Sequence, residues 1–141
     1  MIKYKEFRVI IVEPDPFSRQ WMALLTVRDW RTTLVAEIST PDGLLQYLKK
    51  PTNRIDMILL AIENPLILPR ANWLMDSLAA ISNCPPVLCV GLQGDSRVLK
   101  EMNRKPFVGY LLKEEIRHSM NWAAALAGEG NWVCTPHIYA L

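Results

Sequence analysis

The sequence predicts an α/β fold in which one parallel sheet lies between two layers of helices. Short apolar runs alternate with longer stretches of helical periodicity, and the runs are apolar at consecutive positions rather than at every second position. Consecutive apolar positions are typical of strands that are covered on both faces, as in a doubly wound sheet. The length of 141 residues suits one domain with a core of its own.

Five strand-and-helix units follow one another along the chain. The first strand is expected at Arg8 to Val12, and Asp15 with Pro16 then provides an N-cap and a first helical turn. The second strand is expected at Thr32 to Ile38, before a helix that opens at Thr40 and Pro41. The later strands are expected at Asp56 to Ile62, from Pro86 to Val90 and at Phe107 to Leu112, and the later helices over Leu74 to Ile81, Asp95 to Asn103 and Glu114 to Ala127.

Five such units in succession predict a three-layer, doubly wound, five-stranded parallel sheet of the flavodoxin-like kind, with strand order 2-1-3-4-5. In this arrangement a site lies at the carboxyl ends of the strands, where the strand order reverses. The residues at these ends are Glu13, Pro14 and Asp15, Ala61 to Asn64, Gly91 and Leu92, and Lys113.

Composition and charge narrow the function classes. The formal net charge of +2 gives no general nucleic-acid footprint, so DNA is expected to be contacted only through a domain absent from this chain. The longest apolar run, of about six residues, is too short for a bilayer span. The start of the chain does not look like a signal peptide, and three cysteines without a CxxC motif indicate reduced thiols. We therefore expect a cytoplasmic protein with no contact to membranes.

No catalytic, cofactor or metal motif is expected. The six glycines form neither GxGxxG nor GxxxxGK[ST], which argues against an enzyme that binds nucleotides. No Ser-His-Asp or Cys-His arrangement is suggested near the strand ends. Cys134 and His137 could supply half of a zinc site, but a second ligand pair of the usual spacing is missing. A small-ligand or nucleotide-binding α/β domain remains an alternative.

Four segments resemble a known family: VEPDPFSR at 12–19, MILLAIENP at 57–65, PPVLCVGL at 85–92 and GYLLKEE at 109–115. In order and in strand context they resemble the receiver domains of bacterial response regulators. The stretch at 124–136 is further similar to the end of LuxR-type receivers. The resemblance implies a receiver-like domain over 1–128, with 129–141 as a tail or the start of a linker to a domain not present.

The resemblance also implies five functional positions, of which three are changed. Glu13 stands at the first Mg²⁺-binding acidic position, and Lys113 stands at the phosphate-contacting lysine. Pro14 replaces the second acidic residue, Ala61 the aspartate that accepts the phosphoryl group, and Gly91 the Thr or Ser hydroxyl. Phosphoryl transfer requires an attacking carboxylate and a hard cation held by oxygen ligands. The sequence therefore predicts a pseudo-receiver.

Four charged residues at or near these positions have ordinary structural interpretations. Glu13 and Lys113 are expected to neutralise each other in an ion pair, directly or through a water, because an unpaired buried charge is costly. Asp15, which could be a metal ligand, is expected to cap a helix. Glu63, the other carboxylate near Ala61, is expected to lie on the rim in solvent.

Receivers of this family signal through the surface of the fourth helix, fifth strand and fifth helix. In this chain that surface is expected to carry a switch or partner face made of Arg97, Lys100, Arg104, Tyr110 and Trp122. Tyr110 stands at the position of the family's switch aromatic, although a half-buried strand tyrosine is the alternative.

The resulting hypothesis is a phosphorylation-independent protein-interaction module in bacterial two-component signalling that regulates transcription. Protein partners are expected, either another signalling protein or a second copy in a homodimer. A stand-alone adaptor that docks a kinase or another receiver is the first alternative.

Overall fold

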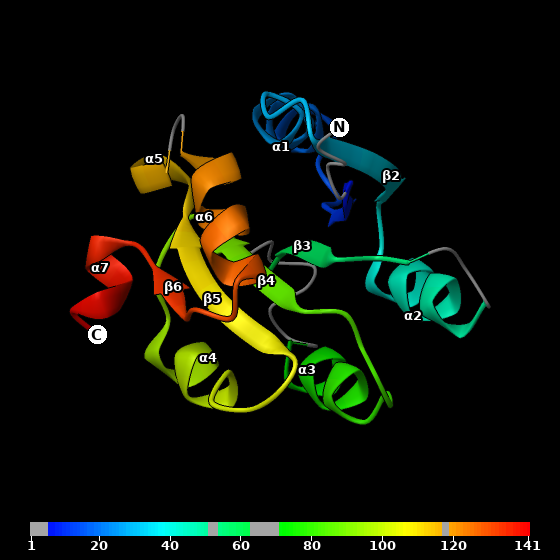
Figure 1. The fold of residues 1–141 in the computed structure, drawn as a ribbon. Coiled ribbons are helices and arrows are strands. Elements are labelled where there is room, and N and C mark those ends of the chain that lie inside the picture. The colour runs from blue at the N-terminus through cyan, green and yellow to red at the C-terminus, as the bar shows by residue number, and fades with distance from the viewer. Residues whose placement is uncertain (1–5, 51–53, 63–70, 117–118) are drawn as a thin grey trace.

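A parallel sheet of six strands runs through the molecule in the order β2-β1-β3-β4-β5-β6 (Figure 1). The computed structural model describes residues 6–50, 54–62, 71–116 and 119–141. The strands are β1 (Phe7–Val12), β2 (Thr32–Ile38), β3 (Met57–Ala61), β4 (Val87–Gly91), β5 (Phe107–Leu112) and β6 (Val133–Cys134). The helices are α1 (Pro16–Thr26), α2 (Pro41–Lys49), α3 (Ala71–Ala79), α4 (Ser96–Glu101), α5 (Lys113–Ile116), α6 (Met120–Gly128) and α7 (Pro136–Tyr139).

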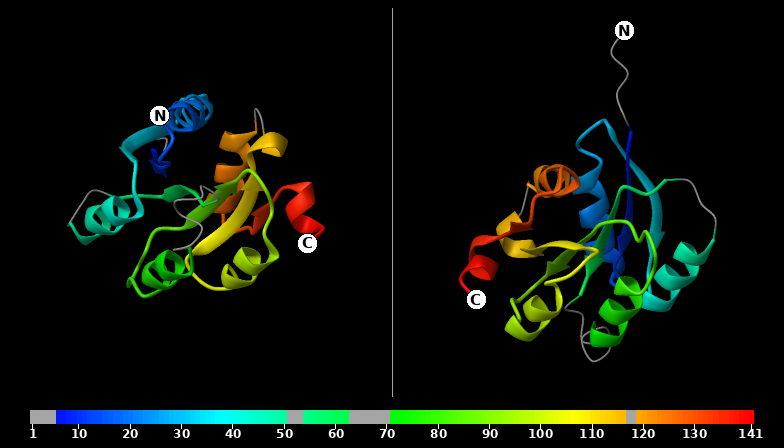
Figure 2. Two further views of the ribbon diagram at one scale, coloured as in Figure 1. Left: turned by 180° about the vertical axis from the view of Figure 1, so that it is seen from behind. Right: turned by 60° about the horizontal axis from the view of Figure 1, so that its bottom comes forward.

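The helices cover both faces of the sheet and enclose two cores. Helices α1 and α6 pack on one face, while α2, α3 and α4 pack on the other (Figure 2). All residues of β3 and β4 are buried, as the continuous apolar runs predicted. The predicted doubly wound α/β fold is therefore confirmed. None of the described helices is long and apolar enough to cross a membrane.

Two predicted helix starts are confirmed by capping hydrogen bonds. The Asp15 carboxylate accepts the backbone N–H of Ser18 at 2.7 Å, at the start of α1. The Thr40 hydroxyl accepts the backbone N–H of Gly43 at 3.0 Å, at the start of α2. In both helices a proline at the first helical position follows the cap, because its fixed φ suits a helix and its missing N–H would have no partner there.

Two features at the C-terminal end differ from the expectation. The prediction of five strands is wrong, since Val133 and Cys134 add β6 along the free side of β5. The sequence did not predict β6, because a strand of two residues is too short to show an alternating or continuous apolar pattern. The single helix predicted over Glu114 to Ala127 is divided into α5 and α6, and the non-helical Ser119 directly precedes α6. Asn64, one of the residues predicted at the strand ends, lies outside the described residues.

The segment after α6, residues 129–141, packs along the edge of β5. Gly109 of β5 pairs with Val133, and a Cβ at Gly109 would lie 2.3 Å from the Val133 carbonyl oxygen. Glycine is therefore required for β6 to approach this closely. The Thr135 hydroxyl accepts the backbone N–H of Leu112 at 2.9 Å, and Ile138 of α7 is buried in the core on the α4 side. The predicted role of 129–141 as the start of a linker stays a prediction.

Candidate functional site

The carboxyl ends of four neighbouring strands bring the predicted site residues to one edge of the sheet. The register pairs Val12 with Leu60, Ala61 with Val90, and Gly91 with Leu112. Glu13 directly follows β1, and Lys113 directly follows β5. The structure therefore gathers Glu13, Pro14, Ala61, Gly91 and Lys113 at the edge where the sequence predicted a site.

A buried ion pair forms at this edge. The Lys113 Nζ lies 2.6 Å from Glu13 Oε1, and the two side chains are 8% and 3% exposed. Two hydrogen bonds also fix the backbone of Glu13. The Glu13 N–H donates to the Ile38 carbonyl at 2.9 Å, and the Glu13 carbonyl accepts from the Arg19 guanidinium at 2.9 Å. The predicted Glu13–Lys113 pair is confirmed as a direct contact.

The other three positions contribute no reactive group. The Ala61 side chain is fully buried at the end of β3 and presents only a methyl group. Gly91 ends β4 without a hydroxyl, and Pro14 offers neither a carboxylate nor a backbone N–H. A phosphoryl group therefore has no acceptor oxygen at position 61. Glu63, the other nearby carboxylate, lies outside the described residues.

These residues do not fit Mg²⁺, the ion that the family resemblance implies. Mg²⁺ is held by carboxylates and waters in near-octahedral geometry. Here the Glu13 carboxylate forms an ion pair with Lys113, and the Asp15 carboxylate caps α1. The side chains of Pro14 and Ala61 contain no oxygen. Within the described part of the chain no group of three or more His, Cys, Asp or Glu side chains could hold a metal ion.

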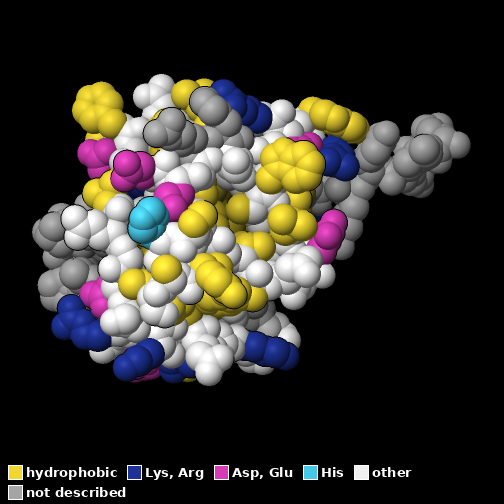
Figure 3. All heavy atoms as spheres, turned by 90° about the vertical axis from the view of Figure 1, so that its left-hand side faces the viewer, with side chains coloured by type: hydrophobic (Ala, Val, Ile, Leu, Met, Phe, Trp, Pro, Cys, Tyr) yellow, Lys and Arg dark blue, Asp and Glu magenta, His cyan; other side chains and the backbone are white. Residues whose placement is uncertain are grey.

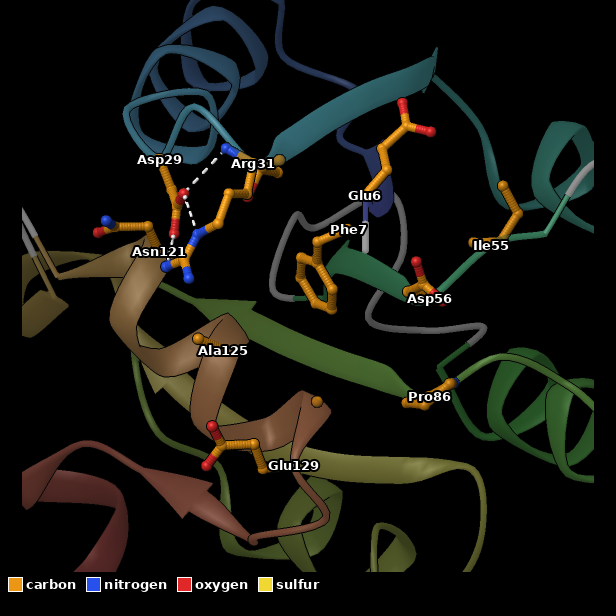
Figure 4. A pocket seen from close by; sticks show the side chains of 12 residues that line it. Glu6, Phe7, Asp29, Arg31, Ile55, Asp56, Pro86, Asn121, Ala125 and Glu129 are labelled. Atoms are coloured by element: carbon orange, nitrogen blue, oxygen red, sulfur yellow. Dashed lines mark hydrogen bonds and ion pairs between the residues drawn. The ribbon is translucent and has the colours of Figure 1, made fainter. Parts of the chain in front are cut away.

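A pocket lies at the opposite end of the strands from Glu13 and Lys113 (Figure 4). Its volume is about 580 Å³, and Phe7, Asp56 and Pro86 line it close to the amino ends of β1, β3 and β4. The Asp29–Arg31 pair closes one side, and the guanidinium keeps the pKa of Asp29 below its usual range through hydrogen bonds. The pocket therefore belongs to a different part of the molecule from Glu13 and Lys113.

The five residues of the predicted partner face do not lie together. Arg97 and Lys100 are exposed on α4, and Arg104 is exposed just after it. Tyr110 is buried in the core beneath α4, whereas Trp122 is exposed on α6 across the sheet. The structure therefore places a basic α4 surface and Trp122 on opposite faces.

The basic side chains on and after α4 have acidic neighbours. Arg97 bonds to Asp95 at 3.1 Å, which lowers the pKa of Asp95 through side-chain and backbone hydrogen bonds. Arg104 bonds to Asp76 at 2.6 Å and to Glu101 at 3.3 Å. These pairs fix the direction of each guanidinium without removing it from solvent.

Tyr110 is held in a buried position rather than exposed at the surface. Its hydroxyl donates to the Gln93 carbonyl at 3.0 Å, in the segment that follows β4. The ring shares its core with Val98 of α4 and Ile138 of α7. Tyr110 is therefore a strand tyrosine in the core, and it is more deeply buried than the half-buried alternative predicted.

Sequence reasoning missed the segment that covers the edge of β5. In this segment Val133 and Cys134 pair with β5, Thr135 accepts a hydrogen bond from Leu112, and Ile138 is buried. One signal was present in the sequence, because Thr135 and Pro136 repeat the cap-and-proline pattern that Thr40 and Pro41 give at α2.

Comparisons with known proteins give neighbours in structure only. No family model matches the chain. No curated protein matches its sequence. The receiver domain of RcsB from Salmonella enterica serovar Typhimurium, solved with the phosphomimetic BeF3⁻, is 13% identical with a TM-score of 0.80, over 96% of this chain and 97% of that one.

Two further solved structures agree with this likeness. A LuxR-family response regulator from Aurantimonas is 17% identical with a TM-score of 0.77, over 96% of this chain and 94% of that chain. A structure of RcsB in complex with DNA gives 13% identity and a TM-score of 0.79, over 96% of this chain and 66% of that one. The chain therefore has the fold of the receiver domains of LuxR-family response regulators.

Proposed function

We propose that this chain is a receiver-like module that does not accept a phosphoryl group and that acts through contacts with other proteins. The observation that carries the proposal is Ala61, whose methyl group is fully buried at the carboxyl end of β3. A receiver phosphorylated at this position needs a carboxylate there, because the oxygen that attacks phosphorus belongs to it.

The Glu13–Lys113 pair supports the same proposal. In phosphoryl transfer a lysine and a cation neutralise the charge of the transferred group. Here the ammonium of Lys113 is in direct contact with Glu13, and no second acidic residue stands at position 14. In the pair, each of the two buried charges neutralises the other. We therefore assign the pair a structural role at the carboxyl ends of the strands.

The setting that we propose is bacterial two-component signalling in the cytoplasm, with regulation of transcription as the output. RcsB has been solved in complex with DNA, and this chain spans about two thirds of the protein in that complex. DNA would be reached through a further domain or a partner protein. The basic side chains of Arg97, Lys100 and Arg104 would contact another signalling protein, since exposed charge steers association and selects partners.

The experiment incubates the chain with Mg²⁺ and acetyl phosphate and measures its intact mass. The RcsB receiver domain serves as the control. We expect no phosphoryl adduct on this chain, and little on Ala61→Asp, because Pro14 and Gly91 still lack their functional groups. A stoichiometric adduct on the unmodified chain contradicts the proposal. Efficient Mg²⁺-dependent labelling of Ala61→Asp shows that the acceptor alone was missing.

A further inference from the structure

The pocket at the amino ends of the strands has the size and the lining of a small-molecule site (Figure 4). Its volume of about 580 Å³ lies within the range of about 300–1,000 Å³ that ligand pockets occupy. Its apolar or small lining residues are Phe7, Ile55, Pro86, Ala125 and Gly128. Polar side chains from β2, from α6 and from the segments before β1 and β3 also line it. We call it the amino-end pocket.

The ring of Phe7 lies in the middle of the amino-end pocket. Figure 4 shows this ring between helix α6, which carries Ala125, and the segment before β3, which carries Asp56. The ring packs against Gly128, since a Cβ on that residue would lie 3.0 Å from Phe7 Cε2. Phe7 is only partly buried, so part of its ring faces the pocket. The apolar part of a ligand would therefore contact Phe7 close to Glu129, the residue that follows Gly128.

One of the four carboxylates that line the amino-end pocket has no counter-charge. The other three form ion pairs with arginines: Glu6 with Arg8 at 3.3 Å, Asp29 with Arg31 at 3.0 Å, and Asp56 with Arg54 at 3.0 Å. The fourth belongs to Glu129, which has no side-chain hydrogen bond or ion pair among the described residues. The pocket therefore carries a single uncompensated negative charge.

This charge favours a positively charged ligand over a neutral or negative one. A carboxylate attracts a cation and repels an anion, and an aromatic ring adds attraction for a cation that lies over its face. The face that carries α7 is different, since Figure 3 shows apolar side chains over its middle and basic ones along its lower edge. That edge would repel the cation that the amino-end pocket attracts.

We infer that the amino-end pocket binds a small organic monocation, a primary ammonium group attached to an apolar chain or ring. The apolar part lies against Phe7, and the ammonium group donates to the Glu129 carboxylate. A monocation matches the single uncompensated charge, whereas a polyamine would bring further charges that have no counterpart in the pocket. The residues changed at the phosphorylation site take no part in this binding, because they lie at the opposite end of the strands.

The inference goes beyond the proposed function, because it gives the module an input from a small molecule. The two can fail separately, since ligand binding is measured without Mg²⁺, a phosphodonor or a partner protein.

Two-dimensional ¹H–¹⁵N NMR of the labelled 141-residue chain measures the binding. The probe is 2-phenylethylammonium, and 3-phenylpropionate is an anion with the same ring and linker. We expect the backbone N–H signals of Phe7, Gly128 and Glu129 to shift with the ammonium probe and to saturate with a dissociation constant of about 1 mM or below. The anion should give no saturable shift. Ethylammonium, which has the charge without the ring, should bind at least about tenfold more weakly.

Three variants test where the probe binds. Ala125→Phe places a ring in the pocket and should raise the dissociation constant at least about tenfold. Glu129→Gln removes the uncompensated charge and should raise it about threefold, since an exposed ion pair contributes little. Glu37→Gln, at an exposed glutamate on β2 outside the pocket, is the matched control and should leave it unchanged. The dispersion of each spectrum shows that the variant is folded.

Three results would overturn the inference. The first is the absence of saturable shifts with the ammonium probe, and the second is equal binding of 3-phenylpropionate. The third is an affinity for the probe that Ala125→Phe or Glu129→Gln leaves unchanged.

Discussion

Removing one partner of the Glu13–Lys113 pair should destabilise the fold strongly. The substitution Lys113→Met keeps a long side chain and removes the ammonium, which leaves the Glu13 carboxylate buried at 3% exposure. Breaking a buried pair from one side costs about 3–5 kcal/mol, because an uncompensated charge remains in the interior. A domain of this kind has a total stability of roughly 5–15 kcal/mol, so the loss is a large share of it.

Urea unfolding followed by circular dichroism measures this loss. With a denaturant slope of about 1–3 kcal/mol per molar urea, the midpoint should fall by about 2 M in Lys113→Met and similarly in Glu13→Met. The double variant carries no charge and should return close to the midpoint of the unmodified chain. Arg97→Met, which breaks an exposed pair with Asp95, is the control and should barely move the midpoint. The reasoning would be refuted if the two single variants kept the midpoint of the unmodified chain. It would also be refuted if the midpoint of the double variant fell by the sum of the two single losses.

Three further predictions concern the rest of the described structure. Gly109→Ala should lower stability by about 1–3 kcal/mol in urea unfolding, because the new Cβ meets the Val133 carbonyl; unchanged stability would mean that β6 does not hold this position. Asp15→Ala should lower the free energy of unfolding by about 1 kcal/mol through the lost helix cap, and a loss below about 0.3 kcal/mol would argue against the cap. His137 should titrate by NMR above the ordinary pKa because of its hydrogen bond to Glu115, and Glu115→Gln should lower that pKa. The stabilisation from this contact is full below the ordinary histidine pKa and is lost as pH rises through the raised one, so a histidine unaffected by Glu115→Gln would contradict it.

The site was predictable from sequence because its residues follow strands whose pattern is unambiguous. The buried run that ends at Ala61 and the run that ends at Leu112 are apolar at consecutive positions, and both strands end where the sequence predicts or within one residue of it. Parallel strands bring their carboxyl ends to one edge, so Glu13 and Lys113 could be paired although 100 positions separate them.

The parts that sequence did not predict depend on contacts between distant segments. The two-residue strand β6 has no pattern of its own, and its place is set by Gly109 and by the Thr135 hydroxyl. Trp30 and Trp122 belong to different strand-and-helix units, and only the packing of α6 against α1 brings them to one groove. Their separate positions in the sequence gave no sign of a common surface.

The segment that covers the edge of β5 also helps to hold Tyr110 in the core. In the family that the sequence resembles, the rotamer of a switch aromatic on the fifth strand is coupled to the Thr or Ser hydroxyl that follows the fourth strand. This chain has Gly91 at that position and therefore lacks the hydroxyl. Tyr110 is instead buried in the same core as Ile138 of α7, and its hydroxyl is bonded to Gln93. Turning this ring outward would break that hydrogen bond and open a core that α7 helps to close, and a buried ring of this size contributes several kcal/mol when packed. These contacts hold the Tyr110 ring in the core, so a partner that binds the surface over β5 does not meet an exposed aromatic side chain at position 110.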